Sequence, residues 1–161
     1  MSTDGFSKIA VIGAGTMGSG IAAQIANAGH EVMLLDLPAR EGADKSPAEM
    51  AIDRLMASDP PQLMHKRNAG RIVTGTISDD FGKLAECDWI IEAVVERLDI
   101  KKDLYARLDD TIGPDCIVSS NTSTIPISLL VEDMPTAFRK RFAITHYFNP
   151  VRYMRLSLIH I

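Results

Sequence analysis

The sequence predicts an α/β fold built on a doubly wound parallel sheet, and three observations lead to this prediction. Short apolar runs alternate with amphipathic segments along most of the chain, which is typical of a parallel sheet covered by helices on both faces. The first apolar run, Ile9 to Ile12, leads directly into the glycine pattern Gly13-Ala14-Gly15-Thr16-Met17-Gly18. A second apolar run ends in an acid, Asp36.

The glycines and the acid together predict a Rossmann-type site for an adenine dinucleotide. Gly13 lets the chain turn out of the strand, Gly15 leaves room for a pyrophosphate, and Gly18 lets the next helix pack close to the sheet. The free N–H groups of that helix point at the phosphates, and Asp36 lies where a carboxylate reaches the ribose hydroxyls. The alternative is that the glycines form only a structural turn.

The charge of Asp36 also bears on the choice of cofactor. A carboxylate accepts hydrogen bonds from a 2′-hydroxyl and repels a 2′-phosphate, so NAD is favoured over NADP. Arg40 is either a partner for a phosphate or a solvated loop arginine. We therefore expect NAD as the cofactor.

Composition indicates one globular domain. The 161 residues, 46% hydrophobic and 24% charged, are enough for one core. A net charge of −4 without a basic cluster argues against nucleic acid as a partner, and no apolar stretch is long enough for a membrane span. Cys87 and Cys116 are not spaced as in a metal-binding or redox CxxC motif, so we expect no metal. Met1 to Ser7 is polar and does not resemble a signal peptide, so we expect a cytoplasmic location.

The first half of the chain carries clear signals for its elements. A helix is expected over residues 17–28, with Gly29 as its C-terminal cap, followed by a strand over residues 31–35. Ser46-Pro47-Ala48-Glu49 is typical of a capping box with proline at the first helical position, and Pro60-Pro61 ends this helix. A more polar helix is expected through Met64 and Lys66.

The remaining elements complete a sheet of about six strands. One helix is expected over residues 101–108. The expected strands cover residues 72–74, 89–95, 116–119 and 142–146.

Three polar segments follow expected strands at their carboxyl ends, where such sheets place functional residues. These segments are Val95-Glu96, Asn121-Thr122-Ser123 and His146-Tyr147-Phe148-Asn149-Pro150. Each has a simpler interpretation. Asn121-Thr122-Ser123 is a common turn or helix cap and formally a glycosylation acceptor, and His146 is equally readable as a structural histidine at a strand end.

Taken together, these motifs resemble the NAD-binding domain of the L-3-hydroxyacyl-CoA dehydrogenases of fatty-acid β-oxidation. The resemblance runs from about Lys8 to Leu156 and is closest to long bacterial members that also carry an enoyl-CoA hydratase region. Its motifs are Gly13-Ala14-Gly15-Thr16-Met17-Gly18, Asp36, Glu92-Ala93-Val94-Val95-Glu96, Ser120-Asn121-Thr122-Ser123 and His146-Tyr147-Phe148-Asn149-Pro150-Val151.

The resemblance implies a role for several residues. His146 is the general base that takes the proton of the substrate's 3-hydroxyl while the C3 hydride passes to NAD, and a near-neutral imidazole suits this task. Ser123 hydrogen-bonds the reacting oxygen. Asn149, counted with His146 and Ser123 among the catalytic residues, lines the nicotinamide end together with Asn121, and both orient without reacting. The implied cofactor-binding residues are Gly13, Ala14, Gly15, Thr16, Met17, Gly18, Asp36, Glu96, Lys101, Asn121, Ser123 and Asn149. Glu96 and Lys101 are also readable as exposed charges at a helix start.

The end of the chain departs from the family. Members pair the histidine with a glutamate twelve residues later, but Leu158 stands at that position. The segment Leu156-Ser157-Leu158-Ile159-His160-Ile161 matches one reading frame of a common transposon-derived sequencing adapter. We expect residues 1–156 to be the NAD-binding domain and 157–161 a non-native tail, so His160 receives no role.

Two classes of function remain open from the sequence. The first is a 3-hydroxyacyl-CoA dehydrogenase that acts on 3-hydroxyacyl-CoA and 3-oxoacyl-CoA and whose C-terminal helical domain is absent from this chain. By the resemblance, the full-length protein is a homodimer, and the fragment alone is inactive. The second is a non-catalytic dinucleotide-binding module, with another NAD-dependent β-hydroxyacid dehydrogenase as a further alternative.

Overall fold

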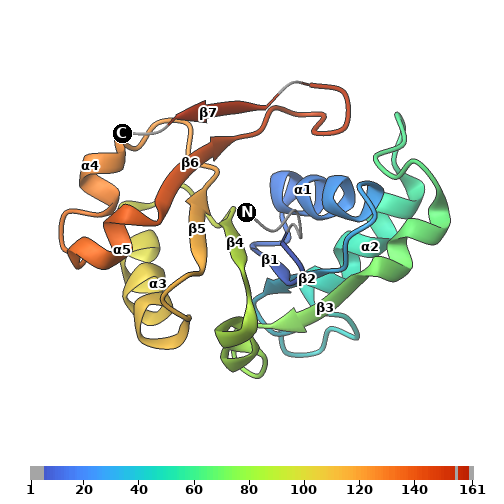
Figure 1. Ribbon diagram of the computed structural model, residues 1–161. Coiled ribbons are helices and arrows are strands. Elements are labelled where there is room, and N and C mark those ends of the chain that lie inside the picture. The colour runs from blue at the N-terminus through green and yellow to red at the C-terminus, as the bar shows by residue number, and fades with distance from the viewer. Residues whose placement is uncertain (1–5, 155, 160–161) are drawn as a thin grey trace.

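A computed structural model describes residues 6–154 and 156–159 of the chain. Its sheet has the strand order β3-β2-β1-β4-β5-β6-β7 (Figure 1). Strands β1 to β6 are parallel, and β7 runs antiparallel to β6. The order reverses between β1 and β4, as in the doubly wound Rossmann fold, so the predicted fold class is confirmed.

The strands and helices alternate through most of the chain. The strands are β1 (Ile9–Ile12), β2 (Val32–Asp36), β3 (Ile72–Thr76), β4 (Trp89–Glu92), β5 (Ile117–Ser120), β6 (Phe142–His146) and β7 (Ser157–Ile159). The α-helices are α1 (Thr16–Asn27), α2 (Pro47–Ala57), α3 (Leu98–Thr111), α4 (Ile127–Leu130) and α5 (Thr136–Lys140). Two 3₁₀ segments, η1 (Lys66–Arg71) and η2 (Phe81–Glu86), complete the set.

Each face of the sheet has its own apolar core. Helices α1 and α2 cover one face, while α3, α4 and α5 lie on the other side (Figure 1). Val11, Ile21 and Leu34 are fully buried in the first core, and Ile12, Ile90 and Phe138 in the second. The residues of β1 and β4 are almost entirely buried, which explains why these strands are nearly continuous apolar runs in the sequence.

The local signals of the first half act as expected. Gly29 takes φ +99° just after α1, a conformation that favours glycine. Ser46 and Glu49 form the predicted capping box at the start of α2: the Glu49 N–H donates to the Ser46 hydroxyl at 3.3 Å, and the Ser46 N–H donates to the Glu49 carboxylate at 2.7 Å.

Two expected elements differ from the structure. The polar helix expected through Met64 and Lys66 is wrong, because only the 3₁₀ segment η1 forms there. The Asn27 side chain accepts a hydrogen bond from the Met64 N–H, and this contact supports an irregular path. The strand expected over residues 89–95 ends at Glu92, whose side chain accepts the Val94 N–H at 2.8 Å and turns the chain out of the sheet.

Four short elements have no counterpart among the sequence predictions: η2, α4, α5 and β7. Strand β7 makes the sheet one strand larger than expected, and it forms within residues 157–159, which the sequence analysis assigns to a tail. The origin of that segment stays a prediction, and His160 and Ile161 lie outside the described residues.

A row of polar groups crosses the sheet at three neighbouring strands. The indole N–H of Trp89, in β4, donates to the hydroxyl of Ser119 in β5 at 3.0 Å. The Thr145 hydroxyl of β6 reaches the same oxygen at 3.0 Å. The Trp89 ring also packs against Phe6, with ring centroids 5.4 Å apart.

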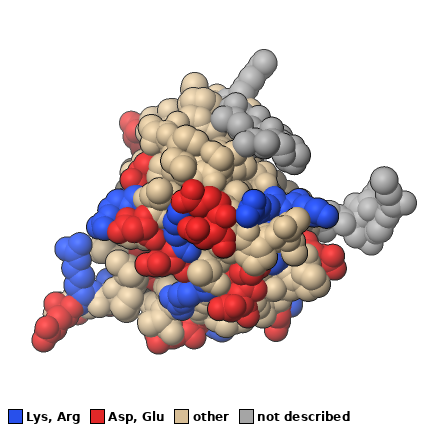
Figure 2. Space-filling view, turned by 90° about the vertical axis from the view of Figure 1, so that its left-hand side faces the viewer, with Lys and Arg blue, Asp and Glu red and all other residues tan. Residues whose placement is uncertain are grey.

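The surface is of mixed charge. On the side that carries α4 and α5, acidic and basic side chains are interspersed (Figure 2). Lys102 of α3, for example, pairs with Glu132 and Asp133. Within the described ranges, no helix is long and apolar enough to cross a bilayer.

Candidate functional site

The glycine loop between β1 and α1 is shaped by close backbone contacts. Gly13 has φ +104°, and a Cβ atom there would lie 2.4 Å from the Ala93 carbonyl oxygen. A Cβ atom on Gly18 would lie 1.7 Å from the Gly13 carbonyl oxygen. By contrast, a Cβ atom on Gly15 would meet nothing within 4 Å. Gly13 and Gly18 therefore serve packing, and Gly15 faces open space of the kind that a pyrophosphate needs.

The start of α1 offers hydrogen-bond donors to an anion. Gly15 is the N-cap residue, no side chain caps the helix, and its first turn holds no acid. Thr16 and Met17 lie in this turn, where the backbone N–H groups have no partner within the helix. The loop thus has the donors and the space to hold the phosphates of a dinucleotide.

Asp36 lies at the carboxyl end of β2 and already holds the loop. One carboxylate oxygen accepts the Ala14 N–H at 2.5 Å, and the other accepts the Leu37 N–H at 2.7 Å. A carboxylate oxygen has two acceptor sites, so both oxygens can still accept a ribose hydroxyl. This bracing contact was not predicted from the sequence.

A cavity of about 340 Å³ joins these groups at the carboxyl edge of the sheet. Its lining combines the glycine loop and Asp36 with the segment after β4: Gly13, Gly15, Asp36, Leu37, Ile77, Ala93, Val94, Val95 and Ile100. Arg54 of α2 holds the same loop from outside by donating to the Ala14 carbonyl at 2.7 Å, a contact that the sequence analysis missed. The residues that line this cavity, which we call the dinucleotide cleft, fit an adenine dinucleotide.

Ser123 and His146 line a second cavity of about 340 Å³. Ser123 lies in the turn after β5, and His146 ends β6, so the neighbouring strands bring them to the same edge of the sheet. The other lining residues are Thr122, Thr124, Ile125, Pro126, Ile127, Ser128 and Ile144. The cavity therefore brings a hydroxyl and an imidazole together, and its remaining walls mix apolar and hydroxyl-bearing side chains.

Glu96 organises the turn that carries Ser123. Its carboxylate accepts hydrogen bonds from the Thr122 hydroxyl, from the Ser123 N–H at 3.2 Å and from the Thr124 hydroxyl at 3.0 Å. Partial burial alone would raise the pKa of Glu96, but the Thr122 hydroxyl and the charge of Lys101 outweigh burial and lower it to about 2. Glu96 is thus an ionised anchor for the turn.

Lys101 is not the exposed helix-start charge that the simpler interpretation allowed. Its side chain is 1% exposed, and its ammonium lies 2.6 Å from the fully buried carboxylate of Glu92 and 3.2 Å from Glu96. Glu96 itself is 38% exposed. Buried charges of this kind need partners, and these three side chains supply them to one another.

The two asparagines lie differently from each other. Asn121 accepts the Tyr147 N–H with its side-chain oxygen at 2.9 Å, so it joins the loop after β5 to the loop after β6. Asn149 is exposed and precedes Pro150 through a cis peptide bond. At the edge of the sheet, the backbone of His146 pairs with Ser157, and that of Thr145 with Leu158.

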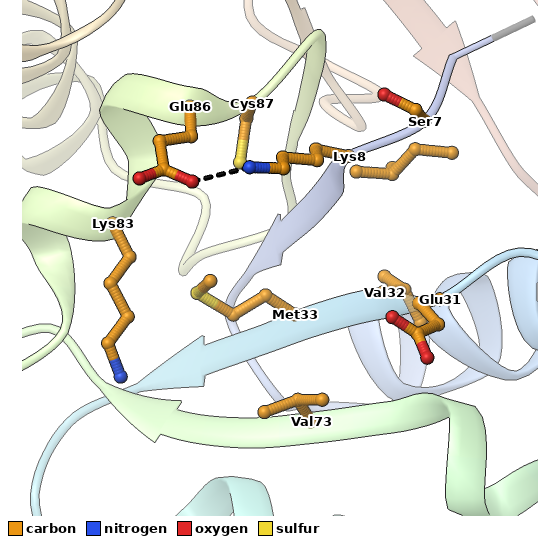
Figure 3. Close-up of a pocket in the computed structure, with 10 residues that line it drawn as sticks. Ser7, Lys8, Glu31, Val32, Met33, Val73, Lys83, Glu86 and Cys87 are labelled. Atoms are coloured by element: carbon orange, nitrogen blue, oxygen red, sulfur yellow. Dashed lines mark hydrogen bonds and ion pairs between the residues drawn. The ribbon is translucent and has the colours of Figure 1, made fainter.

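A third cavity, of about 410 Å³, lies at the opposite end of the sheet (Figure 3). It is lined by the amino ends of β1 and β2 and by η2, and Lys8 pairs with Glu86 at its rim at 2.5 Å. The Cys87 thiol lies here, and burial raises its pKa to about 11, which disfavours the thiolate form. None of the expected site residues lines this cavity. The described residues also contain no cluster of three metal-ligating side chains.

Comparison with known proteins identifies the kind of domain that this chain forms. Residues 8–159 match the family model described as "3-hydroxyacyl-CoA dehydrogenase, NAD binding domain". A Deinococcus radiodurans protein that carries the name of a 3-hydroxyacyl-CoA dehydrogenase is 41% identical over 92% of this chain and 43% of its own length. A Rickettsia felis protein with the name of a fatty acid oxidation complex trifunctional enzyme is 43% identical over 92% of this chain and 21% of its own.

Solved structures give the same result. The 3-hydroxybutyryl-CoA dehydrogenase of Escherichia coli matches with a TM-score of 0.77 and 33% identity, over 94% of this chain and 31% of that one. The (S)-3-hydroxybutyryl-CoA dehydrogenase of Ralstonia eutropha matches with a TM-score of 0.74 and 32% identity, over 95% and 53%. The chain therefore spans between about a fifth and a half of the length of these relatives.

Proposed function

This chain belongs to the 3-hydroxyacyl-CoA dehydrogenase family, of which it forms the NAD-binding domain, and from this membership we propose that it serves fatty-acid β-oxidation. The proposed reaction transfers a hydride between NAD and C3 of the 3-hydroxyacyl-CoA and 3-oxoacyl-CoA pair. NAD, held at the glycine loop, supplies the hydride acceptor or donor. The family membership and the cofactor are the premises; the substrate and the residue roles are the proposal.

The observation that carries this proposal is the cavity shared by Ser123 and His146. A hydroxyl and an imidazole lie in one space whose walls include Ile125, Pro126 and Ile144. An alcohol substrate with an apolar chain needs a base, a hydrogen-bond partner for its oxygen and an apolar surface. This cavity offers all three at the same edge of the sheet as the dinucleotide cleft.

In the proposed oxidation, His146 accepts the proton of the 3-hydroxyl while the hydride leaves C3 for NAD, so the alcohol becomes a ketone. Ser123 hydrogen-bonds the reacting oxygen in both directions. In reduction, the protonated His146 returns the proton to that oxygen. Asn121 and Asn149 orient the nicotinamide end, and Glu96 and Lys101 hold the turn beside it.

The chain alone is proposed to be an inactive cofactor-binding half. Leu158 stands where the family resemblance places the acid that orients the histidine, and an alkyl side chain cannot stabilise an imidazolium. The proposed partner of this chain is a C-terminal helical domain that closes the acyl-CoA cleft and supports a homodimer. Cofactor binding without activity is also what the second candidate function, a dinucleotide-binding module without turnover, would show.

A chimera tests the proposal. Residues 1–156 are joined to the part of the Deinococcus radiodurans relative that aligns from position 157 onward, with glutamate at position 158, and NADH consumption is followed with acetoacetyl-CoA. We expect turnover, and His146→Gln should lower kcat about 100-fold or more while NADH affinity changes little. Ser123→Ala should cost less, because it removes one hydrogen bond and leaves the proton acceptor in place.

Two outcomes would contradict the proposal. A folded chimera that binds NADH without turning over acetoacetyl-CoA would favour the non-catalytic module. A His146→Gln chimera that keeps most of its rate would show that His146 has a structural role.

A further inference from the structure

A buried carboxylate, Glu92, lies behind the turn that carries Ser123. It ends β4 in the middle of the sheet and is fully buried. One carboxylate oxygen accepts the Val94 N–H at 2.8 Å and the Lys101 ammonium at 2.6 Å. The other accepts the hydroxyls of Tyr105 and Ser120, both at 2.6 Å. A single side chain thus joins β4, α3 and β5.

Stability alone is a weak reason for this arrangement. Removing a carboxylate from water costs several kcal/mol, and apolar residues of similar volume often replace buried ion pairs without loss of stability. The four donors supply two hydrogen bonds to each oxygen of the Glu92 carboxylate. These hydrogen bonds offset the free-energy cost of removing the carboxylate from water. What the arrangement gives in addition is a fixed position for the groups bonded to it.

Two short routes lead from Glu92 to the turn. In the first, Lys101 bridges Glu92 at 2.6 Å and Glu96 at 3.2 Å, and Glu96 accepts the Ser123 N–H at 3.2 Å. In the second, the Ser120 hydroxyl that donates to Glu92 accepts the Thr122 N–H at 3.2 Å. Both routes end within residues 122–124.

We propose that Glu92 is a positioning residue: through Lys101 and Ser120 it fixes the turn of residues 122–124, and with it the place of the Ser123 hydroxyl. Glu92 itself lines neither the dinucleotide cleft nor the cavity of Ser123 and His146. The inference rests on the proposed function insofar as Ser123 meets the reacting oxygen. Its structural content, the control of the turn, is testable separately.

Glu92→Gln is the sharpest variant. A glutamine amide has one oxygen and one NH₂ group, and all four groups around Glu92 donate. The ammonium of Lys101 and the Val94 N–H cannot accept, whereas the hydroxyls of Tyr105 and Ser120 can turn to accept. The amide therefore places its NH₂ group on the hydroxyl side, keeps the shape of the site and removes the charge that holds Lys101.

The turn is observed directly through its backbone amides. At 17.6 kDa the protein suits ¹H–¹⁵N correlation spectroscopy, in which the Ser123 and Thr124 N–H signals report their hydrogen bonds to Glu96. We expect Glu92→Gln to shift both signals although neither group touches Glu92. Glu132→Gln is the matched control, because it breaks the surface ion pair of the adjacent Lys102 and should leave both signals in place.

NADH affinity, measured by calorimetry, is the second readout. We expect Glu92→Gln to weaken NADH binding about tenfold, the scale of one lost charge-assisted hydrogen bond, and Glu132→Gln to have no effect. If Glu92 acts through Lys101 and Ser120, adding Glu92→Gln to the double variant Lys101→Met/Ser120→Ala should weaken NADH binding no further. Tyr105→Phe keeps the lysine link and should leave the turn signals unchanged.

Unchanged Ser123 and Thr124 signals in a folded Glu92→Gln protein would overturn the inference, as would a further loss of NADH affinity on the Lys101→Met/Ser120→Ala background. If Glu92→Gln does not fold, Glu92→Asp carries the test, because it draws the carboxylate back from Lys101 and Ser120 and must shift the same signals. If the unmutated chain fails to bind NADH, the functional assignment fails, and the amide signals still decide the role of Glu92.

Discussion

At the scale of single residues, Asp36 has two tasks that depend on its charge. It holds the glycine loop through the Ala14 N–H, and it lines the cavity in which a ribose would lie. The first task needs only an acceptor, whereas the second also repels a second negative group. The two tasks are separable because the first does not depend on the identity of the dinucleotide.

We therefore expect the unmutated chain to bind NADH more tightly than NADPH in calorimetry. Asp36→Asn keeps an acceptor for the loop and removes the charge, so it should narrow the difference between the two affinities. Asp36→Ala should narrow it as well and also weaken NADH binding, because the loop loses its brace. Equal affinities in the unmutated chain would remove the argument from charge.

Glu96 makes stability depend on pH. Its pKa lies near 2 in the folded protein, below the ordinary value of 4.5, so its ionised form favours folding. This contribution is fully present above about pH 5 and is lost as the pH falls from there toward 2. Glu96→Gln should therefore be less stable than the unmutated chain at pH 6, and the difference should shrink by pH 3. Urea unfolding at several pH values measures this; a constant difference would contradict it.

Residue-level prediction from the sequence was uneven for a physical reason. Glycines and a strand-end acid have fixed tasks in a dinucleotide site, so their spacing was informative. The burial of Lys101 and Glu92 was not foreseen, because charged residues are mostly exposed and their pairing depends on which strands become neighbours. A glutamate at the end of an otherwise apolar strand was the one available signal.

At the scale of elements, the turn from β1 into α1 separates packing from binding. Gly18→Ala forces a Cβ atom against the Gly13 carbonyl, so we expect a large loss of stability together with loss of NADH binding. Gly15→Ala has room in the protein and an ordinary φ of −66°, so its stability should change by about 1 kcal/mol or less.

Thermal unfolding and calorimetry on Gly15→Ala and Gly18→Ala test these two expectations. Gly15→Ala should shift the unfolding temperature by no more than about 4 °C while its NADH affinity falls, because the added methyl group occupies the space left for the pyrophosphate. If Gly15→Ala binds NADH as tightly as the unmutated chain, the phosphates do not lie over Gly15.

Elements with strong local signals were predicted well, and elements fixed by distant contacts were not. The capping box at Ser46 is complete within four residues, so the local sequence alone predicts it. Segment η1 follows a path supported by Asn27 of α1, more than thirty residues earlier in the chain. Strand β7 consists of a pairing with β6 and has no distinctive pattern of its own.

At the scale of the whole molecule, the three cavities described above lie at two opposite edges of the sheet. The clefts that hold the expected site residues open at the carboxyl edge, and the third cavity opens at the amino edge. The sequence predicted this edge correctly, because strand order in a parallel α/β sheet dictates where loops converge. It did not predict the cavity at the amino edge, which depends on the short crossover through η2.

We expect the 161-residue chain to bind NADH yet reduce acetoacetyl-CoA near background. The glycine loop and Asp36 are complete, whereas His146 has Leu158 in place of an orienting acid, and the proposed helical domain supplies the rest of the acyl-CoA cleft. NADH consumption with acetoacetyl-CoA on material of verified mass is the measurement. Turnover at about 1 to 10³ per second, the usual enzymatic range, would refute the prediction.

The position of Trp89 gives this protein a built-in optical probe. The chain contains one tryptophan, and its indole is fixed to Ser119 at the amino end of β4. The strand ends at Glu92, three residues further along, which is a distance of about 10 Å. Emission from the indole overlaps the absorption of a reduced nicotinamide, and this separation suits resonance energy transfer. Quenching of the ultraviolet fluorescence should therefore report NADH occupancy without any label, and a red shift should report separately the opening of the sheet.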